Sequence, residues 1–440
     1  MKLFVSLLLC LGAASLYAQD NPVQKFGKLK PSDFEKKVYD IDTGASAVVL
    51  FEVGSAEIEG NNKGFFSVVY KHHKRVHVLN KNGYDHADVS IGIYNSNGME
   101  VDLENLKAVT YNLVDGKIVE TKLEKSAIFK EKIDKESSLK KFTLPNVKEG
   151  SIIEYEYRIT SDFYNHIRPW IFQTSSPNLW SEFKFSVPQF LQYVFLSQGY
   201  VPFHINDRKD RTTTYRIVES NGASASQAFS LSSGVTDYRW VMKNVPAIKK
   251  EGFTSTVSNY QSKIEFQLSG YQQPLTPQNI MGTWPMLTKN LMENEYFGLP
   301  LKNNNSWLSD EVKPLIAAST SDADKARRIY AYVRDNYTCT DYSNIYIDKS
   351  LKDVMKTKKG NVSELNLLLT AMMKYAGLQA EPVILSTSDN GFVYALYPIL
   401  RRFNYVVCKV EIDDAKYMLD ASRQRLGFGR LTPDCYNGHA

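Results

Sequence analysis

Residues 360–377 read GNVSELNLLLTAMMKYAG, and this stretch has the beginning, the periodicity and the end of one α-helix. Asn361 can cap the first turn, and Glu364, three residues further on, completes a capping box. Gly377 is the residue type that commonly ends a helix. The side chains at helical spacing that we expect to be buried are Leu365, Leu368, Leu369, Met372 and Tyr375. The pattern therefore predicts a helix over residues 361–376.

The hydrophobic pattern becomes helical after about residue 275. Residues 283–296 can form a helix with a Thr as cap and a Pro in the first turn. Residues 323–337 place apolar side chains on one stripe at helical spacing. Strand-like runs follow the long helix at residues 381–387, 403–411 and 416–420. The C-terminal part is therefore predicted to be an α+β domain.

The part of the chain before residue 275 alternates with a period of two. In residues 151–160 (SIIEYEYRIT), Ile and Tyr alternate with Glu and Arg, which is typical of a half-buried strand. Residues 263–268 alternate in the same way. The dipeptide Asp115-Gly116 tolerates positive φ, so it predicts a hairpin between residues 107–114 and 117–123. We expect an N-terminal antiparallel β-sandwich-like domain.

Composition limits the class of protein. Of the 440 residues, 43% are hydrophobic and 23% are charged, which is close to an average soluble protein. This balance excludes a disordered chain, a collagen-like fibre and a multi-span membrane protein. The formal net charge is only +5, and a surplus that small, spread along the chain, does not indicate nucleic-acid binding. We therefore expect no nucleic-acid partner.

The first 18 residues predict export. Lys2 precedes an apolar run at residues 3–11, and small residues lead to Ala18, as in a cleaved signal peptide. The run is too short to span a bilayer, which takes about 20 apolar residues. We expect no transmembrane segment later in the chain. The protein is therefore predicted to be exported, to the periplasm or the cell surface of a Gram-negative bacterium.

The long helix and the strands after it carry a family resemblance. Residues 360–377, 403–410 (FNYVVCKV) and 417–421 (YMLDA) resemble the transglutaminase-like branch of the papain-like superfamily. In that family a Gly precedes a Cys in the first turn of a long helix. A His lies on a following strand, commonly after an Asn, and an Asp lies on the next strand. The resemblance implies a papain-like fold for this part of the chain.

The resemblance extends to the organisation of the chain. Residues 144–157 and 240–247 are similar to the domain of unknown function that accompanies such modules in secreted bacterial proteins, which usually continue into a further β domain. The expected segments are a signal peptide at 1–18, a β-rich domain of unknown function at 19–275, a helical connector at 276–319 and a transglutaminase-like domain at 320–440.

The chemistry of this family needs a Cys thiolate at the helix N-terminus, a His that takes its proton and an Asp that orients the His. The resemblance places the nucleophile at Val362, the base at Tyr405 and the orienting acid at Asp420. Val has no nucleophilic group, and Tyr, with an ordinary pKa of about 10, is a poor base at neutral pH. We therefore expect a degenerate triad and no catalytic residue.

The remaining thiols and imidazoles offer few substitutes. Cys339, Cys408 and Cys435 remain after removal of the signal peptide, which permits at most one disulfide. No histidine lies between residues 205 and 438, so Cys339 is kept only as a reserve nucleophile. His166 is the best-placed imidazole of the β-rich part, although a loop histidine packed on Trp170 is the favoured interpretation.

Three histidines near the start of the β-rich part, His72, His73 and His77, suggest a metal site. In a strand His73 and His77 share one face, but no third ligand is evident. A solvated basic strand edge, with the adjacent lysines and arginine, is the favoured interpretation. We expect neither a metal nor a cofactor.

Three functions remain open. The favoured one is an exported, non-catalytic transglutaminase-like protein, a pseudoenzyme with a binding or scaffolding role. The second is an active cysteine peptidase or amide-transferring enzyme that uses a non-standard nucleophile. The third is an adhesion or scaffold protein whose β-rich domain does the binding. The partner, which is a protein, a peptide or a glycan, stays open in all three.

Overall fold

The computed structural model describes residues 22–94, 101–133, 137–219, 227–252, 254–302 and 305–439. The predicted signal peptide at residues 1–18 lies outside them. The chain divides into two compact units, which are described separately. The first consists of Met1–Lys249 with Tyr260–Ile280, and the second of Lys250–Asn259 with Met281–Ala440.

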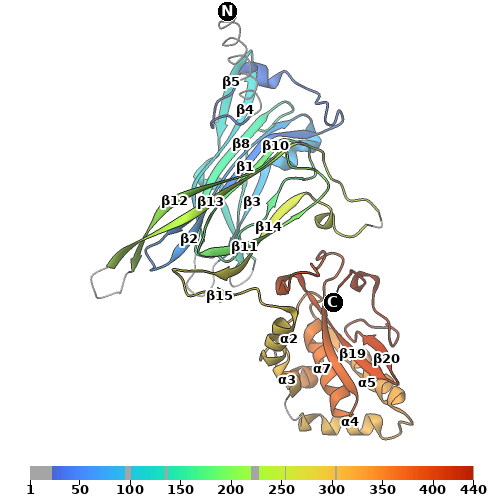
Figure 1. Cartoon of the computed structure of the whole chain (residues 1–440). Coiled ribbons are helices and arrows are strands. Elements are labelled where there is room, and N and C mark those ends of the chain that lie inside the picture. The colour runs from blue at the N-terminus through green and yellow to red at the C-terminus, as the bar shows by residue number, and fades with distance from the viewer. Residues whose placement is uncertain are drawn as a thin grey trace, which may run out of the picture. The chain divides into compact units, whose positions relative to one another are not determined.

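The first unit is built from β-sheets (Figure 1). The largest sheet has, in spatial order, β12 (Ile205–Glu219), β13 (Gln227–Val245), β10 (Asn178–Pro188), β1 (Ala47–Gly60), β2 (Phe66–Val78), β8 (Ile152–Ser161), β4 (Val101–Val114) and β5 (Lys117–Lys122). A second sheet contains β11 (Leu191–Gln198), β14 (Lys263–Tyr271), β15 (Gln278–Asn279) and β9 (Trp170–Ile171). A third contains β3 (Asp88–Tyr94), β7 (Ser137–Thr143) and β6 (Phe129–Lys132).

The pairing of the large sheet departs from the antiparallel expectation at one place. Strands β1 and β10 are parallel, with Val53 beside Glu182 and Ser55 beside Lys184. The other neighbours in this sheet are antiparallel. A parallel pair needs a long crossover connection, and nothing in the alternation of either strand announces such a partner.

The predicted hairpin forms between β4 and β5. Asp115 and Gly116 both have positive φ, 49° and 73°, and Val114 pairs with Lys117 across the turn. Two central residues with positive φ match the right-handed twist of the flanking strands. The dipeptide therefore fixes the register of this edge hairpin, as the sequence predicts.

Strand β8 has the predicted alternation, but its second face is also covered in part. Ile153 and Ile159 are buried in the main core. On the opposite face, Glu154 is buried as well, because the chain around Gly27 packs there and the Gly27 N–H donates to Glu154 Oε2 at 3.0 Å. Arg75 Nη2 donates to Glu154 Oε1 at 2.7 Å, so this buried carboxylate is paired.

The main core of the first unit joins the large sheet to the second sheet. Phe183 and Phe185 of β10 contact Phe266 of β14, with ring centroids 5.4 and 5.1 Å apart. Trp240 of β13 contacts the same ring at 5.9 Å. Aromatic side chains thus fill the space between the two sheets, which accounts for the abundance of Phe and Tyr in this half of the chain.

The second unit is an α+β unit. Its helices are α2 (Trp284–Glu293), α3 (Leu299–Lys302), α4 (Ser309–Ile316), α5 (Asp322–Asn336), α6 (Leu351–Thr357) and α7 (Val362–Tyr375). One sheet has the order β18 (Gln379–Leu385), β19 (Tyr405–Ile412) and β20 (Ala415–Leu419), and β16 (Thr338–Cys339) pairs with β17 (Lys359–Gly360). The expected connector at residues 276–319 contains α2, α3 and α4, whose buried residues belong to the same core as α7.

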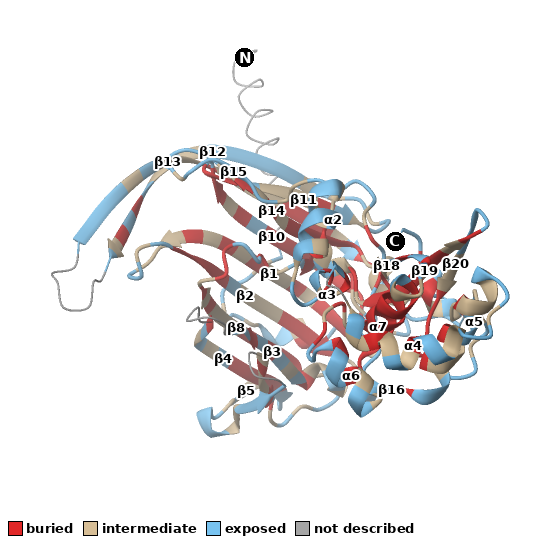
Figure 2. Cartoon of the chain, turned by 90° about the horizontal axis from the view of Figure 1, so that it is seen from below, coloured by how far each residue is buried: buried red, intermediate tan, exposed pale blue. Residues whose placement is uncertain are grey.

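Helix α7 is the centre of this unit and is buried on every side (Figure 2). The predicted capping box is present, with Glu364 N donating to Asn361 Oδ1 at 2.8 Å and Asn361 N donating to Glu364 Oε2 at 2.8 Å. Gly377 has φ +82° just beyond the helix. The expectation of one buried stripe was wrong, because β18 and β19 lie against one side and α5 and α6 against others. Tyr375, expected in the stripe, is only partly buried.

Helix α5 has the single buried stripe that its sequence predicts. Ala326, Ile329, Tyr330 and Val333 are its buried residues, at helical spacing. Ser321 caps its first turn by accepting a hydrogen bond from the Asp324 N–H. Among the described residues, no helix is both long enough and apolar enough to cross a bilayer.

Candidate functional site

The N-terminus of α7 lies against a short strand that carries a thiol. Cys339 of β16 pairs with Gly360 of β17, and Thr340 N donates to Gly360 O at 2.8 Å. Val362, the first residue of α7, donates its N–H to Asp341 O at 2.8 Å. These contacts place the reserve thiol beside the start of the helix, where the family places its nucleophile.

The positions of the nucleophile and the base meet in one small apolar cluster. Val362 of α7 and Tyr405 of β19 are both fully buried there, together with Leu385, Val407 and Cys435. Cys339 packs against the same cluster. The structure therefore brings together the side chains that the sequence singled out, and it fills the place of a reactive pair with apolar contacts.

Tyr405 is held as a hydrogen-bond donor toward the acid position. Its Oη donates to Asp420 Oδ2 at 2.8 Å and lies 3.0 Å from Ser422 Oγ. Arg423 Nε donates to Tyr405 Oη at 3.3 Å. Burial and the adjacent Asp420 carboxylate both raise the pKa of Tyr405 well above its ordinary value. The phenol therefore keeps its proton at neutral pH.

Asp420, just beyond β20, is fully buried and has several donors. Its Oδ1 accepts from Asn366 Nδ2 at 3.0 Å, from Ser422 N at 2.9 Å and from Ser422 Oγ at 2.6 Å. Asn366 also donates to Val406 O at 2.9 Å and accepts from Ala421 N at 2.9 Å. The Asp at the position that the resemblance assigns to the acid is thus the centre of a polar network that joins α7, β19 and the end of β20.

Sequence reasoning missed Asn366 and Ser422 in this network. A signal for Asn366 was present, because an Asn stands in the middle of an otherwise apolar helix, where a polar side chain needs a buried partner. Ser422 follows Asp420 by two residues and offers only a common residue type. Cys435 was likewise not expected beside Val362, since it lies far away along the chain.

All three described thiols are held in their neutral form. Burial raises the pKa of Cys339 to about 11, that of Cys435 to about 11 and that of Cys408 to about 12. Cys339 Sγ donates to Asp341 O at 3.2 Å. The cysteines form no disulfide in the described residues. His439, the histidine nearest to them in sequence, is exposed near the end of the chain.

A cavity of about 420 Å³ opens beside this cluster. Cys339 and Tyr342 line one part of it, and Ser422, Arg423 and Arg425 line another. The Arg423 guanidinium lies 3.9 Å from the centre of the Tyr342 ring, within the range of a cation–π contact. The cavity therefore offers cationic and hydroxyl groups to a ligand.

The three histidines of β2 do not lie on a solvated strand edge, so that interpretation was wrong. Strand β2 is an interior strand between β1 and β8. His72 bonds Glu52 Oε1 at 3.0 Å, and His73 bonds Glu154 Oε1 at 2.7 Å. His166 lies in an exposed position of a loop. No group of three or more His, Cys, Asp or Glu side chains in the described ranges is arranged to hold a metal ion.

His77 predicts a loss of stability as the pH falls. Burial lowers its pKa from 6.5 to about 4, and its Nδ1 hydrogen-bonds Tyr39 Oη at 2.9 Å. As the pH falls, the unfolded chain therefore binds a proton before the folded chain does. The stability that the neutral, buried imidazole contributes is complete above about pH 6.5 and is lost as the pH falls to about 4. Linkage limits it to about 3 kcal/mol. Urea unfolding over a pH series should show a flatter profile for His77→Gln than for the native chain.

A Tyr39→Phe variant provides the control for this prediction. It removes the hydroxyl that bonds His77 Nδ1 but keeps the buried imidazole, so the loss of stability between pH 6.5 and 4 should persist. Parallel profiles for His77→Gln and the native protein between pH 6.5 and 4 would contradict the assignment.

The long central helix and the strands that follow it form a transglutaminase-like domain. The family model described as the transglutaminase-like superfamily matches residues 310–418. The model of a domain of unknown function with solved structure, DUF3857, matches residues 66–249. The resemblance predicted from sequence is therefore confirmed, as is the order of a β-rich domain followed by an α+β domain.

A solved structure supports the fold. A protein of Parabacteroides distasonis, described as a "putative protease", is similar with a TM-score of 0.54 and 15% identity over 86% of this chain and 68% of that chain. An M1 zinc metallopeptidase of Deinococcus radiodurans matches with a TM-score of only 0.18 and 8% identity, over 59% of this chain and 55% of that chain. None of the curated proteins compared with this chain matches it. The first likeness supports the architecture alone.

Proposed function

We propose that this chain is an exported, non-catalytic transglutaminase-like protein whose C-terminal cavity binds a peptide or glycan without cleaving it. The observation that supports the proposal is that Val362 and Tyr405, to which the resemblance assigns the positions of nucleophile and base, are both buried in one apolar cluster. A Val side chain cannot attack a carbonyl, and a buried phenol that donates to Asp420 cannot accept a proton.

The polar network around Asp420 supports a retained fold with an altered use. In an active site of this family, the acid would orient an imidazole. Here the same carboxylate accepts hydrogen bonds from Tyr405 and Asn366, and these bonds hold α7 to the strands. The groups that line the adjacent cavity, among them Arg423 and Arg425, suit binding of polar groups. Export rests on the sequence of the first 18 residues.

Thiol reactivity tests this proposal. We expect Cys339, Cys408 and Cys435 of the folded, reduced protein to react slowly with iodoacetamide below pH 8.5, because burial raises the pKa of each thiol. The measurement is alkylation over a pH series, with each site mapped by mass spectrometry, and the urea-unfolded protein serves as the control in which all three react. One cysteine that reacts as fast in the folded as in the unfolded chain near pH 7 would overturn the proposal.

Such a result would support the second candidate function, an active cysteine peptidase or amide-transferring enzyme. The observation that favours this alternative is the position of Cys339, which is only partly buried, lines the cavity and lies beside the N-terminus of α7. The Cys339 thiolate would then attack the carbonyl carbon of a peptide or amide substrate, forming a thioester on Cys339 as the C–N bond breaks and the amine leaves with the proton of the thiol. A Cys339→Ser variant would lose the activity.

A further inference from the structure

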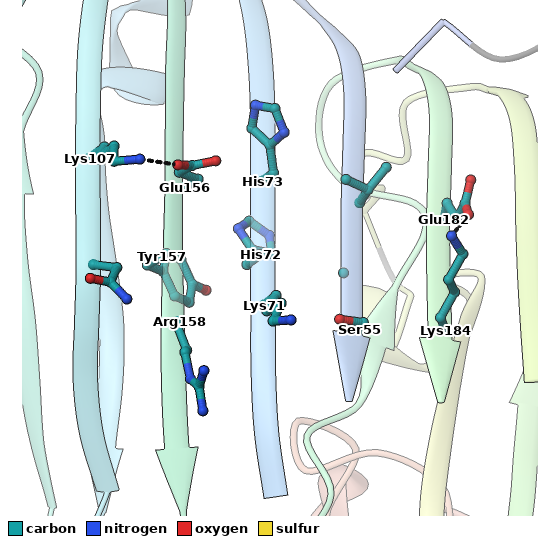
Figure 3. A pocket seen from close by; sticks show the side chains of 13 residues that line it. Ser55, Lys71, His72, His73, Lys107, Glu156, Tyr157, Arg158, Glu182 and Lys184 are labelled. Carbon is teal, nitrogen blue, oxygen red and sulfur yellow. Dashed lines mark hydrogen bonds and ion pairs between the residues drawn. The ribbon is translucent and has the colours of Figure 1, made fainter. Parts of the chain in front are cut away.

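A second cavity, of about 500 Å³, lies on one face of the large sheet of the first unit (Figure 3). Its side chains come from five adjacent strands, β4, β8, β2, β1 and β10. Because side chains alternate along a strand, the residues that face this cavity form rows that run across the sheet. Two such rows line this cavity, and they differ in charge.

The first row carries charges of both signs. In register across the strands it consists of Lys107, Glu156, His73, Val53 and Glu182. Lys107 Nζ pairs with Glu156 Oε1 at 2.8 Å, and opposite charges stand side by side in the usual way. The other carboxylate of this row, Glu182, pairs with Lys184 and Arg239 of the second row, so the first row leaves no carboxylate without a cation.

Between β8 and β13, the second row has four cations and no carboxylate. In register across these strands it consists of Arg158, Lys71, Ser55, Lys184 and Arg239. Arg158 stands directly opposite Lys71, and Lys184 stands directly opposite Arg239. Like charges in directly opposite positions destabilise a sheet. The row therefore contains two pairs of like charges, and a bound anion would reduce the repulsion within them.

Neighbouring carboxylates compensate only part of this row. Glu182, of the first row, pairs with Arg239 at 2.9 Å and with Lys184 at 3.1 Å. Arg158 lies 3.5 Å from Glu104, its neighbour in register on β4, and 3.4 Å from Glu59. Lys71 is exposed, and none of the ion pairs found within the described part of the chain includes it. Lys71 is thus the cation of this row without a carboxylate partner, and Lys184 shares its partner, Glu182, with Arg239.

We propose that this groove binds a small molecule carrying two anionic groups, one at Lys71 and Arg158 and the other at Lys184. Ser55, between Lys71 and Lys184 in the row, offers a hydroxyl to the part that joins them. Strands lie about 4.8 Å apart, so the two cationic positions are separated by about 10 Å at the backbone. The volume is within the range of small-molecule sites. The anionic groups are carboxylates or phosphates, and this site is independent of the cavity in the second unit.

Isothermal titration calorimetry with the mature, full-length protein tests the site. The probes are citrate for carboxylates and inorganic tripolyphosphate for phosphates. Each probe is titrated at two salt concentrations, about 20 mM and about 150 mM, because salt screens exposed charges and weakens their interactions. We expect at least one probe to bind at a single site, and the one that binds identifies the ligand class. Lys71→Ser should weaken that binding at least 10-fold.

A matched variant distinguishes binding at a defined site from a general effect of the positive surface charge. Lys117, exposed on the edge strand β5 of the same sheet, lies outside the cavity, so Lys117→Ser should change the affinity less than twofold. A Ser55→Asp variant should abolish binding and raise the melting temperature, because it places a carboxylate between cations. Equal losses for Lys71→Ser and Lys117→Ser, or no binding of either probe, would overturn the proposal.

Discussion

A double variant, Val362→Cys with Tyr405→His, is expected to react with iodoacetamide at pH 6.5 about 100-fold faster than Val362→Cys alone. A thiol at position 362 would lie in the first turn of α7, where the helix dipole and unpaired N–H groups favour a thiolate. An imidazole at position 405 would lie in the same cluster and within reach of Asp420, which now receives the Tyr405 hydroxyl.

The magnitude follows from two opposing effects. In the single variant, burial should hold the pKa of the new thiol high, as it does for Cys339. A histidine partner that lowers this pKa by about four units raises the thiolate fraction about 10⁴-fold, while the lower basicity reduces intrinsic reactivity by about half of that on a logarithmic scale. The net expectation is about 100-fold.

Mass spectrometry of alkylation at position 362 over a pH series measures this difference. The single variant is the control, since it carries the same thiol without a base. A folded double variant that reacts no faster than the single variant would show that Val362 and Tyr405 do not occupy the positions of nucleophile and base. In that case the proposed loss of catalysis would lose its structural foundation.

The sequence was most informative where local rules decide the structure. The capping box of α7, its Gly terminus and the Asp115-Gly116 hairpin depend on neighbours within a few residues, and all three are present. The same holds for the buried stripe of α5. In each case, the free energy that selects the conformation comes from hydrogen bonds and torsions within one short segment.

The sequence was least informative where distant segments meet. Neither the parallel pairing of β1 with β10 nor the interior position of β2 can be read from alternation, which gives the faces of a strand but not its neighbours. His73 looked like a residue of a solvated edge because its partner, Glu154, comes from another strand. The register that places Lys71 opposite Arg158 also depends on which strands are neighbours, so the alternation does not predict it.

The candidate site lies between these extremes. Family resemblance was enough to place Val362, Tyr405 and Asp420 close together, because it supplied the order of one helix and two strands. It did not supply the second partner of the acid. Asn366 lies on α7 one turn beyond Val362 and turns its amide toward Asp420, a contact that depends on how closely α7 packs on β19.

Replacing Asp420 with Ala is expected to destabilise the second unit by about 3–5 kcal/mol. The carboxylate is fully buried and accepts hydrogen bonds from Tyr405, Asn366 and Ser422. Removing it leaves these donors without their acceptor in a site that water does not reach, and removal of one partner of a buried polar or ionic network costs this much. If Asp420 had only a catalytic role, its replacement would leave the stability of the unit unchanged.

Urea unfolding measures this effect, with hydrogen exchange of the α7 amides as a report on the second unit alone. Asp389 is exposed, so Asp389→Ala should change the free energy of unfolding by at most about 0.5 kcal/mol. Asp420→Asn, which keeps one carbonyl acceptor, should fall between the two. If Asp420→Ala costs no more than Asp389→Ala, the buried network does not hold α7 to its strands. The retained acid would then have to be explained by a function of the cavity rather than by the stability of the fold.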